Sequence, residues 1–192
     1  MRFLVMPGRY RSPGPSWRAV YEDRSGAVGV TVWENAAAYP RAWSPRSIRE
    51  VPDADAAKAV LLAGDGDLAC VSVVEDPTEA MLAAEGGADV SVTGLDWDEL
   101  RLSVHADGPA LIVVSDQVYL GWEATVGGRP TEIRPANLAM RAVAVADGEH
   151  ELVFRYRPRV FLVGVILAVV GVATLLGRWL VPPAVRRLRR TP

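Results

Sequence analysis

Eighteen consecutive residues near the carboxyl end, 160–177, carry no charged side chain. A helix of that length spans roughly 27 Å, close to the ~30 Å thickness of the hydrocarbon core of a bilayer. Beyond Arg178, which can snorkel, Leu180 and Val181 extend the apolar stretch, and Pro182 then stops the helix. The sequence therefore predicts a transmembrane helix over residues 160–181. A helix buried in a soluble core is the alternative, although such helices rarely run this long without a polar face.

Charge is divided between the body of the chain and its end. Residues 1–159 hold 16 basic and 23 acidic side chains, whereas residues 160–192 hold five arginines and no acid. The acidic body argues against nucleic acid as a partner, because nucleic-acid binding needs a concentrated basic face. The arginine-rich tail, residues 182–192, favours a single-pass protein of the cell membrane with a cytoplasmic C-terminus and an extracytoplasmic body.

The residues that usually carry cofactor or metal chemistry are few. Cys70 is the only cysteine, which excludes a disulfide framework and a thiolate metal cluster. His105 and His150 lie on separate predicted strands without a third ligand, so we expect no metal site and no cofactor.

Pro7 interrupts the first apolar residues, so they form no signal peptide, and no other segment of this sequence is expected to carry an extracytoplasmic body across the membrane. We therefore expect this chain to be the C-terminal piece of a larger protein.

The first half of the body is predicted to mix strands with short helices. Residues 17–22 and 28–34 are β-rich runs joined by a hairpin-like connection. Asp53 is placed to cap a helix through Ala63, which Gly64 ends. Shorter extended or helical segments are expected at 40–43, 47–51, 68–74 and 77–85.

The second half has the clearer strand pattern. Apolar and polar side chains alternate over residues 100–106, which is typical of a strand with one wet face. Turn signals such as Gly127-Gly128 separate successive runs, and strands at intervals of about 8–12 residues favour an antiparallel sandwich. Strands are predicted at 89–95, 99–106, 110–115, 119–126, 129–134, 140–145 and 149–156.

These patterns together predict a mainly-β fold. It consists of a small mixed α/β N-terminal portion at residues 1–87 and an antiparallel, jelly-roll-like β-sandwich at 88–159. The transmembrane helix at 160–181 and the basic tail at 182–192 follow. Because only three residues separate the last strand from the helix, the sandwich is expected to lie close to the bilayer.

Four segments carry motifs in a fixed order. They are VWENAAAYPRA at 32–42, the run ending YLGWEATVGGRP at 111–130, RPANLAMR at 134–141 and GEHELVFRYRP at 148–158. In this order they resemble the bacterial YfhO family of membrane proteins, with its "YYPGW…DG" and "RAN-x-x-F-R" stretches. This sequence departs from those stretches at Val118, Leu120, Gly127 and Met140.

The resemblance implies a role in building the cell envelope. YfhO-family proteins are polytopic and resemble GT-C glycosyltransferases, which transfer sugars from lipid-linked donors to envelope polymers. By resemblance, this chain is their non-catalytic extracytoplasmic C-terminal domain and last helix, with the catalytic polytopic membrane part and the envelope polymer as partners. Two alternatives stay open: a free-standing single-pass membrane protein whose sandwich binds an envelope partner or glycan, and an enzyme in its own right.

One group of residues is a candidate for contact with a glycan or a partner. Tyr119 and Trp122 lie at a strand start, where an exposed aromatic pair would stack on a sugar face while Asp116 and Asn137 hydrogen-bond its hydroxyls. Arg141 would bind an anionic group, since its guanidinium matches phosphate geometry. The alternative is structural: the Trp122 ring fills the core and the arginine pairs with a neighbouring acid.

A second group is a candidate for contact with lipid headgroups. Its members flank the predicted membrane helix on both sides, where arginine reaches lipid phosphates and tryptophan suits the headgroup zone. They are Arg155, Arg157, Arg159, Arg178 and Trp179.

Overall fold

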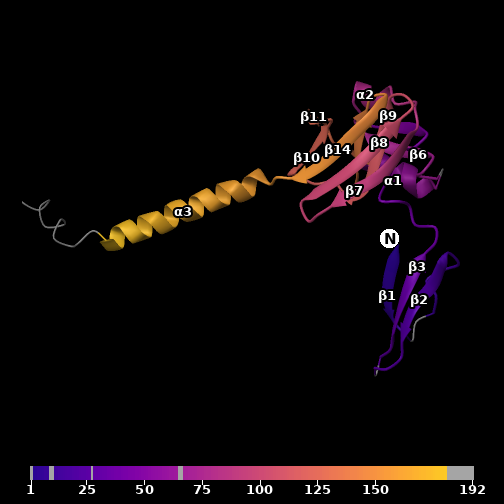
Figure 1. Ribbon diagram of the computed structural model, residues 1–192, viewed down its shortest axis with the longest axis horizontal. Helices are drawn as coiled ribbons and strands as arrows, with labels where there is room; N and C mark the ends of the chain where they lie inside the picture. The colour runs from indigo at the N-terminus through magenta and orange to yellow at the C-terminus, as the bar shows by residue number, and fades with distance from the viewer. Residues whose placement is uncertain (1, 9–10, 27, 65–66, 181–192) are drawn as a thin grey trace, which may run out of the picture.

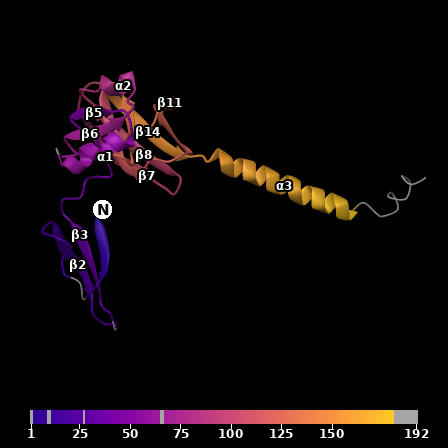
Figure 2. The same ribbon diagram turned by 180° about the vertical axis from the view of Figure 1, so that it is seen from behind.

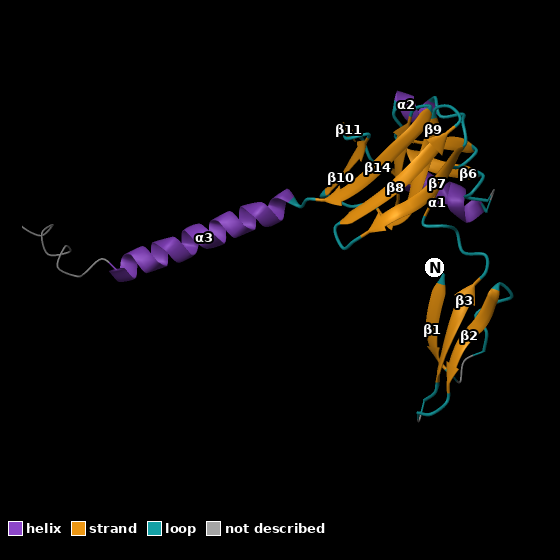
Figure 3. Ribbon diagram, viewed as in Figure 1, coloured by secondary structure: helices purple, strands orange, loops and turns teal. Residues whose placement is uncertain are grey.

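The computed structural model describes residues 2–8, 11–26, 28–64 and 67–180 of the 192-residue chain. Val181 and the predicted basic tail at 182–192 lie outside the described residues. Strands dominate the described chain (Figure 3), so the expectation of a mainly-β fold is confirmed.

The first strands form a small sheet of their own. β1 (Phe3–Pro7), β3 (Val30–Asn35) and β2 (Trp17–Asp23) pair antiparallel in that order. The predicted hairpin between the second and third strands is confirmed, whereas β1 was not predicted. This sheet lies apart from the remaining strands (Figure 1).

The remaining strands form two larger sheets. One has the order β11 (Arg129–Thr131), β10 (Trp122–Val126), β14 (Gly148–Tyr156), β8 (Glu99–Ala106) and β7 (Ala88–Leu95). The other has the order β4 (Ala42–Trp43), β9 (Ala110–Gln117), β13 (Met140–Val145), β12 (Arg134–Ala136), β6 (Val71–Glu75) and β5 (Ser47–Val51).

The main hydrophobic core lies between these two sheets. Alternate residues of β8, from Leu100 to Ala106, are buried and meet Ile112 and Val143 of the second sheet. Leu152 and the ring of Phe154 complete this layer from β14. Side chains that alternate between core and solvent are what a sheet with one wet face requires, so the two sheets pack as a sandwich.

The second sheet is covered on its outer face as well. Leu111 and Val113 of β9 point away from the main core and are buried with Trp43 and with Met81 of α2 (Glu79–Leu82). Because both faces of β9 are covered, its five residues from Ala110 are apolar without alternation.

Helix α1 (Ala54–Ala63) has the predicted ends. The carboxylate of Asp53 accepts a hydrogen bond from the backbone N–H of Ala56 at 2.9 Å, and Gly64 closes the helix in the left-handed region at φ +73°. The buried Ala57 lets the helix approach β5 and β6 (Figure 2). The helix connects these two strands, which therefore pair parallel.

Three details differ from the expectations. The second sheet draws strands from both sides of the boundary predicted at residues 87 and 88. Five and six strands with one parallel pair are not the eight antiparallel strands of a jelly roll. The strand predicted at 129–134 is two strands, β11 and β12, in different sheets. Local patterning does not report which strand a segment pairs with, and that is the physical reason for all three.

Helix α3 (Arg159–Leu180) follows β14 after only Arg157 and Pro158 and extends away from the sandwich (Figures 1 and 2). Its large apolar side chains from Val160 to Leu176 are exposed wherever they are described. Among the described residues, no helix combines the length and the apolar character that crossing a bilayer requires. The predicted transmembrane helix is thus left unsupported by this finding.

Candidate functional site

A buried arginine is the centre of the candidate site. Arg141 of β13 is only 1% exposed, and its guanidinium carbon lies 3.9 Å from the centroid of the Trp122 ring and 5.3 Å from that of Phe154. The pairing of β13 with β9 shifts register between Met140 and Arg141. Such an irregularity re-aims the side chains beside it. The guanidinium therefore lies against two aromatic rings, in the geometry of a cation–π contact.

Asp116 forms ion pairs with this arginine and with a second one. Its carboxylate lies 3.1 Å from the Arg141 guanidinium and 2.9 Å from that of Arg41. Burial lowers the pKa of Arg141, and the charge of Asp116 opposes that shift. Nε and Nη1 of Arg141 are buried without a hydrogen-bond partner among the described residues. The guanidinium is therefore held by one carboxylate and by ring stacking.

Three aromatic rings gather at the end of the sandwich from which α3 departs. The ring centroid of Tyr156 lies 5.4 Å from those of Tyr119 and Trp122, which are 6.1 Å from each other. Gly121 has φ +103°, and a Cβ there would lie 2.8 Å from Cε2 of Tyr156. This position needs glycine, both for its backbone conformation and for the close approach of the Tyr156 ring.

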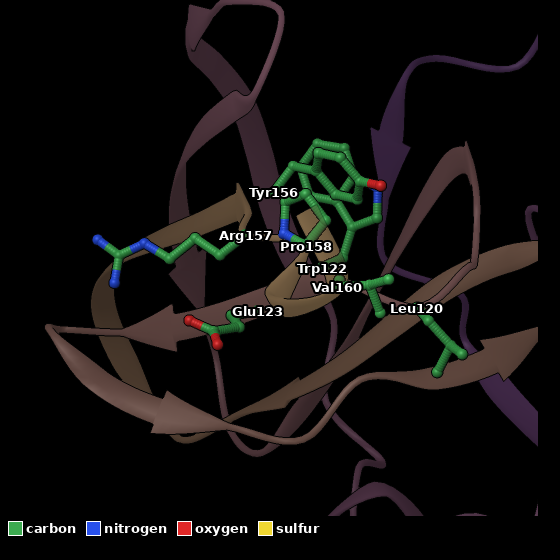
Figure 4. Close-up of a pocket in the computed structure, with 8 residues that line it drawn as sticks. Leu120, Trp122, Glu123, Tyr156, Arg157, Pro158 and Val160 are labelled. Carbon is green, nitrogen blue, oxygen red and sulfur yellow. The ribbon is translucent and has the colours of Figure 1, made fainter. Parts of the chain in front are cut away.

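Two cavities lie at this aromatic cluster. The smaller, about 230 Å³, is lined by polar and aromatic residues and two leucines, which are Arg41, Leu95, Asp96, Trp97, Glu99, Leu100, Asp116, Gln117, Tyr119, Trp122 and Arg141. The larger, about 470 Å³, adjoins the start of α3 and is lined by residues 120–123, 156–158 and 160. Figure 4 shows the side chains of Leu120 and Arg157 pointing away from the rings of Trp122 and Tyr156.

A second charged cluster borders the smaller cavity. Glu99 accepts hydrogen bonds from Arg155, whose Nε lies 2.7 Å from the carboxylate, and from Arg101. These hydrogen bonds lower the pKa of Glu99, the bond from Arg155 contributing most. Arg155, expected to contact lipid, is thus engaged within the protein.

The structure brings four of the five proposed contact residues together. Asp116, Tyr119, Trp122 and Arg141 all line the smaller cavity. Asn137 is not among the lining residues described for it: its carboxamide oxygen accepts from the backbone N–H of Val73 at 2.9 Å, and its Nδ2 donates to Oγ of Ser72. Asn137 therefore joins the β12–β13 turn to β6, which is a structural task.

The expected headgroup contacts are placed only in part. Arg157 and Arg178 are exposed on either side of the apolar stretch of α3. The side chains of Arg159 and Trp179 lie outside the described part of the chain.

Sequence reasoning assigned no role to Trp97, Glu99 or Tyr156. Glu99 meets Arg155 across 56 residues of sequence, so no local spacing indicates the pair. Tyr156 lies opposite Trp122 in the pairing of β10 with β14, which only the strand register reveals.

Fold and site together define a two-sheet β-domain with an arginine–aromatic cluster at the base of an apolar C-terminal helix. A family model described as "Bacterial membrane protein YfhO" matches residues 109–168. The match runs from β9 into α3 and covers about a third of the chain, and over these residues it confirms the resemblance found in the motifs. It includes Asp116, Tyr119, Trp122 and Arg141. No curated protein and no solved structure matches the chain.

Proposed function

We propose that the chain is the extracytoplasmic C-terminal β-domain and last membrane helix of a YfhO-like polytopic protein, auxiliary to sugar transfer onto a cell-envelope polymer. The observation that carries this proposal is the family match, which contains both the aromatic site and the start of α3. The chain itself contributes no catalytic group to the transfer. Its partners are membrane lipid, the catalytic polytopic part and the acceptor polymer.

Insertion of α3 into the bilayer is supported by its surface. The helix has 22 residues, which correspond to about 33 Å, and its exposed valines, leucines and isoleucine occur at successive positions from 165 to 167 and at 169 and 170. Apolar side chains on every side of a helix are typical of a helix surrounded by lipid. The arginines of residues 182–192 then favour a cytoplasmic C-terminus.

Binding of a glycan in the smaller cavity is supported by its lining. The ring of Tyr119 is half exposed and offers a face for stacking on a sugar, while Asp116 and Arg41 provide hydrogen-bonding groups on the same cavity. Arg41 is more accessible than Arg141 and is the cation that would meet a phosphate of the polymer. In this function the domain presents the acceptor to the catalytic part.

Alkaline carbonate extraction of membranes tests the anchor. The full chain is expected to stay in the membrane pellet, whereas a variant with Ile166→Arg and Val170→Arg is expected to be released, because each arginine at the helix centre costs roughly 2.5–3.5 kcal/mol. The matched control carries Ile166→Leu and Val170→Leu and is expected to stay in the pellet. Release of the unaltered chain would refute the proposed anchor.

The alternative is a free-standing single-pass protein whose sandwich binds an envelope glycan unaided. It is favoured by one observation: the smaller cavity combines the half-exposed ring of Tyr119 with the polar groups of Asp116 and Arg41. Titration of the purified chain with a soluble glycerol-phosphate polymer separates the two functions. Binding that is lost in Tyr119→Ala supports the alternative, while binding that needs the co-expressed polytopic part supports the main proposal.

A further inference from the structure

Two apolar side chains stand almost fully in solvent at the base of α3. Trp97, in the loop between β7 and β8, is 98% exposed, and Leu120, in the loop between β9 and β10, is 95% exposed. Leu95 and Tyr119 beside them are at least half exposed. We call these four residues the apolar rim. A rim of this kind is unusual in a soluble domain, where a large aromatic side chain normally gains from burial.

Backbone hydrogen bonds attach both loops to the segment that leads into α3. The N–H of Tyr156 donates to the carbonyl of Asp98 at 2.7 Å, and the N–H of Arg157 donates to the carbonyl of Gly121 at 2.6 Å. The loop between β7 and β8 lies on the side of the sandwich from which α3 departs (Figure 1). The apolar rim is therefore held at a fixed position beside the helix start.

The short connection sets how far the rim can be from lipid. Only Arg157 and Pro158 separate β14 from α3, and two residues span at most about 7 Å. The headgroup zone on each side of the hydrocarbon core is about 5–8 Å deep. A bilayer crossed by α3 therefore brings its headgroup zone to the level of both loops.

We propose that the apolar rim docks the sandwich onto the surface of the bilayer, with Trp97 and Leu120 inserted at the boundary between headgroups and acyl chains. This inference rests on the proposed membrane insertion of α3 and adds a second lipid contact, made by the sandwich. The indole ring suits this boundary, and the exposed Arg157 meets lipid phosphates. Asp96 and Asp98 flank Trp97, so the surface bound is zwitterionic phospholipid, because an anionic leaflet would repel these carboxylates.

Docking of the apolar rim on the bilayer also sets the direction in which the smaller cavity opens. The smaller cavity is lined by three residues of the rim, Leu95, Trp97 and Tyr119. With the rim at the lipid boundary, the mouth of the cavity faces the membrane surface. A ligand carried on a lipid therefore reaches the cavity without leaving the bilayer.

The test uses the full chain reconstituted in phosphatidylcholine vesicles. Trp97→Cys or Leu120→Cys, each made with Cys70→Ser, is labelled with an environment-sensitive fluorophore. The matched control is Leu62→Cys on α1, which is 76% exposed and lies away from α3. Lipid carrying a nitroxide quencher near the headgroup is expected to quench the probes at 97 and 120 at least twofold more than the probe at 62. A quencher deep in the acyl chains is expected to act less.

Each further outcome decides the proposal. Equal quenching at all three positions in chains that float with the vesicles overturns docking and leaves the anchor intact. Chains that do not float overturn both the docking and the anchor. Quenching that grows with the protein-to-lipid ratio would assign the rim to contact with a second copy of the chain. Quenching that needs anionic lipid would assign it to a different membrane surface. Either result also overturns the proposal. The test is repeated without a label by comparing the lipid quenching of intrinsic tryptophan fluorescence in the unaltered chain with that in Trp97→Phe.

Discussion

Removal of the buried Arg141 side chain tests how the candidate site is held together. Arg141→Ala loses the contact with the Trp122 ring at 3.9 Å and the ion pair with Asp116 at 3.1 Å, and it leaves a void beside Phe154. Truncation of a large buried side chain to alanine costs about 3–5 kcal/mol, and a desolvated cation–π contact accounts for about 2 kcal/mol of such a loss. We therefore expect a loss of about 3–5 kcal/mol in the free energy of unfolding.

Two further variants divide this loss into its causes. Arg141→Met keeps a side chain against the rings, and Asp116 retains Arg41 as a partner at 2.9 Å, so we expect a loss of only about 1.5–3 kcal/mol, the strength of one charge-assisted hydrogen bond. Combining Arg41→Ala with Arg141→Met deprives Asp116 of both guanidinium groups described beside it. This double variant is expected to lose about 0.5–3 kcal/mol more than the sum of the single variants.

Urea unfolding of the detergent-solubilised chain, followed by far-ultraviolet circular dichroism, measures these differences. A loss below about 1 kcal/mol for Arg141→Ala would refute the cation–π and ion-pair interpretation, because no buried charge would then depend on these partners. Losses that simply add in the double variant would show that Arg41 and Arg141 do not share the carboxylate of Asp116.

Three more predictions use the same unfolding assay. Gly121→Ala is expected to lose about 1–3 kcal/mol through its positive φ and the close Tyr156 ring, whereas Gly87→Ala, which has open space for a Cβ, should lose little. Hydrogen bonds from Arg155 and Arg101 lower the pKa of Glu99 in the folded state. The stabilisation by Glu99 is therefore complete above the unfolded pKa of about 4.3 and is lost as the pH falls through the folded pKa. Glu99→Gln should lower the urea midpoint at pH 7, and the midpoint of this variant should decline less toward pH 3. Asn137→Ala should lose about 1–3 kcal/mol in the free energy of unfolding, because the N–H of Val73 loses its acceptor, and should leave glycan affinity unchanged. A loss of glycan affinity in a folded variant would instead place Asn137 among the binding residues.

Local chemistry made part of the fold predictable from sequence. The ends of α1 follow from the capping carboxylate of Asp53 and from Gly64, both of which act within four residues of their partners. The β2–β3 hairpin and most strands of the sandwich follow in the same way from alternation and turn residues. The parallel pairing of β5 and β6 was not predictable, because the pattern of each strand fits either direction.

The candidate site was predictable only where its residues are close in sequence. Tyr119 and Trp122 were found because they share one turn, and Asp116 precedes them by a few residues. The contact of Arg41 with Asp116 spans 75 residues, and no periodicity reports it. The burial of Arg141 was equally hidden, since an arginine on a strand usually faces water and only the rings of Trp122 and Phe154 make its position favourable.

The register of the five-stranded sheet links this site to α3. Trp122 lies directly opposite Tyr156 in the pairing of β10 with β14. Tyr156 is two residues before Pro158 and three before the start of α3. The face of Trp122 that meets Arg141 therefore belongs to a ring that also packs against the strand leading to the helix. One indole ring thus contacts both the buried guanidinium and the strand that leads to α3.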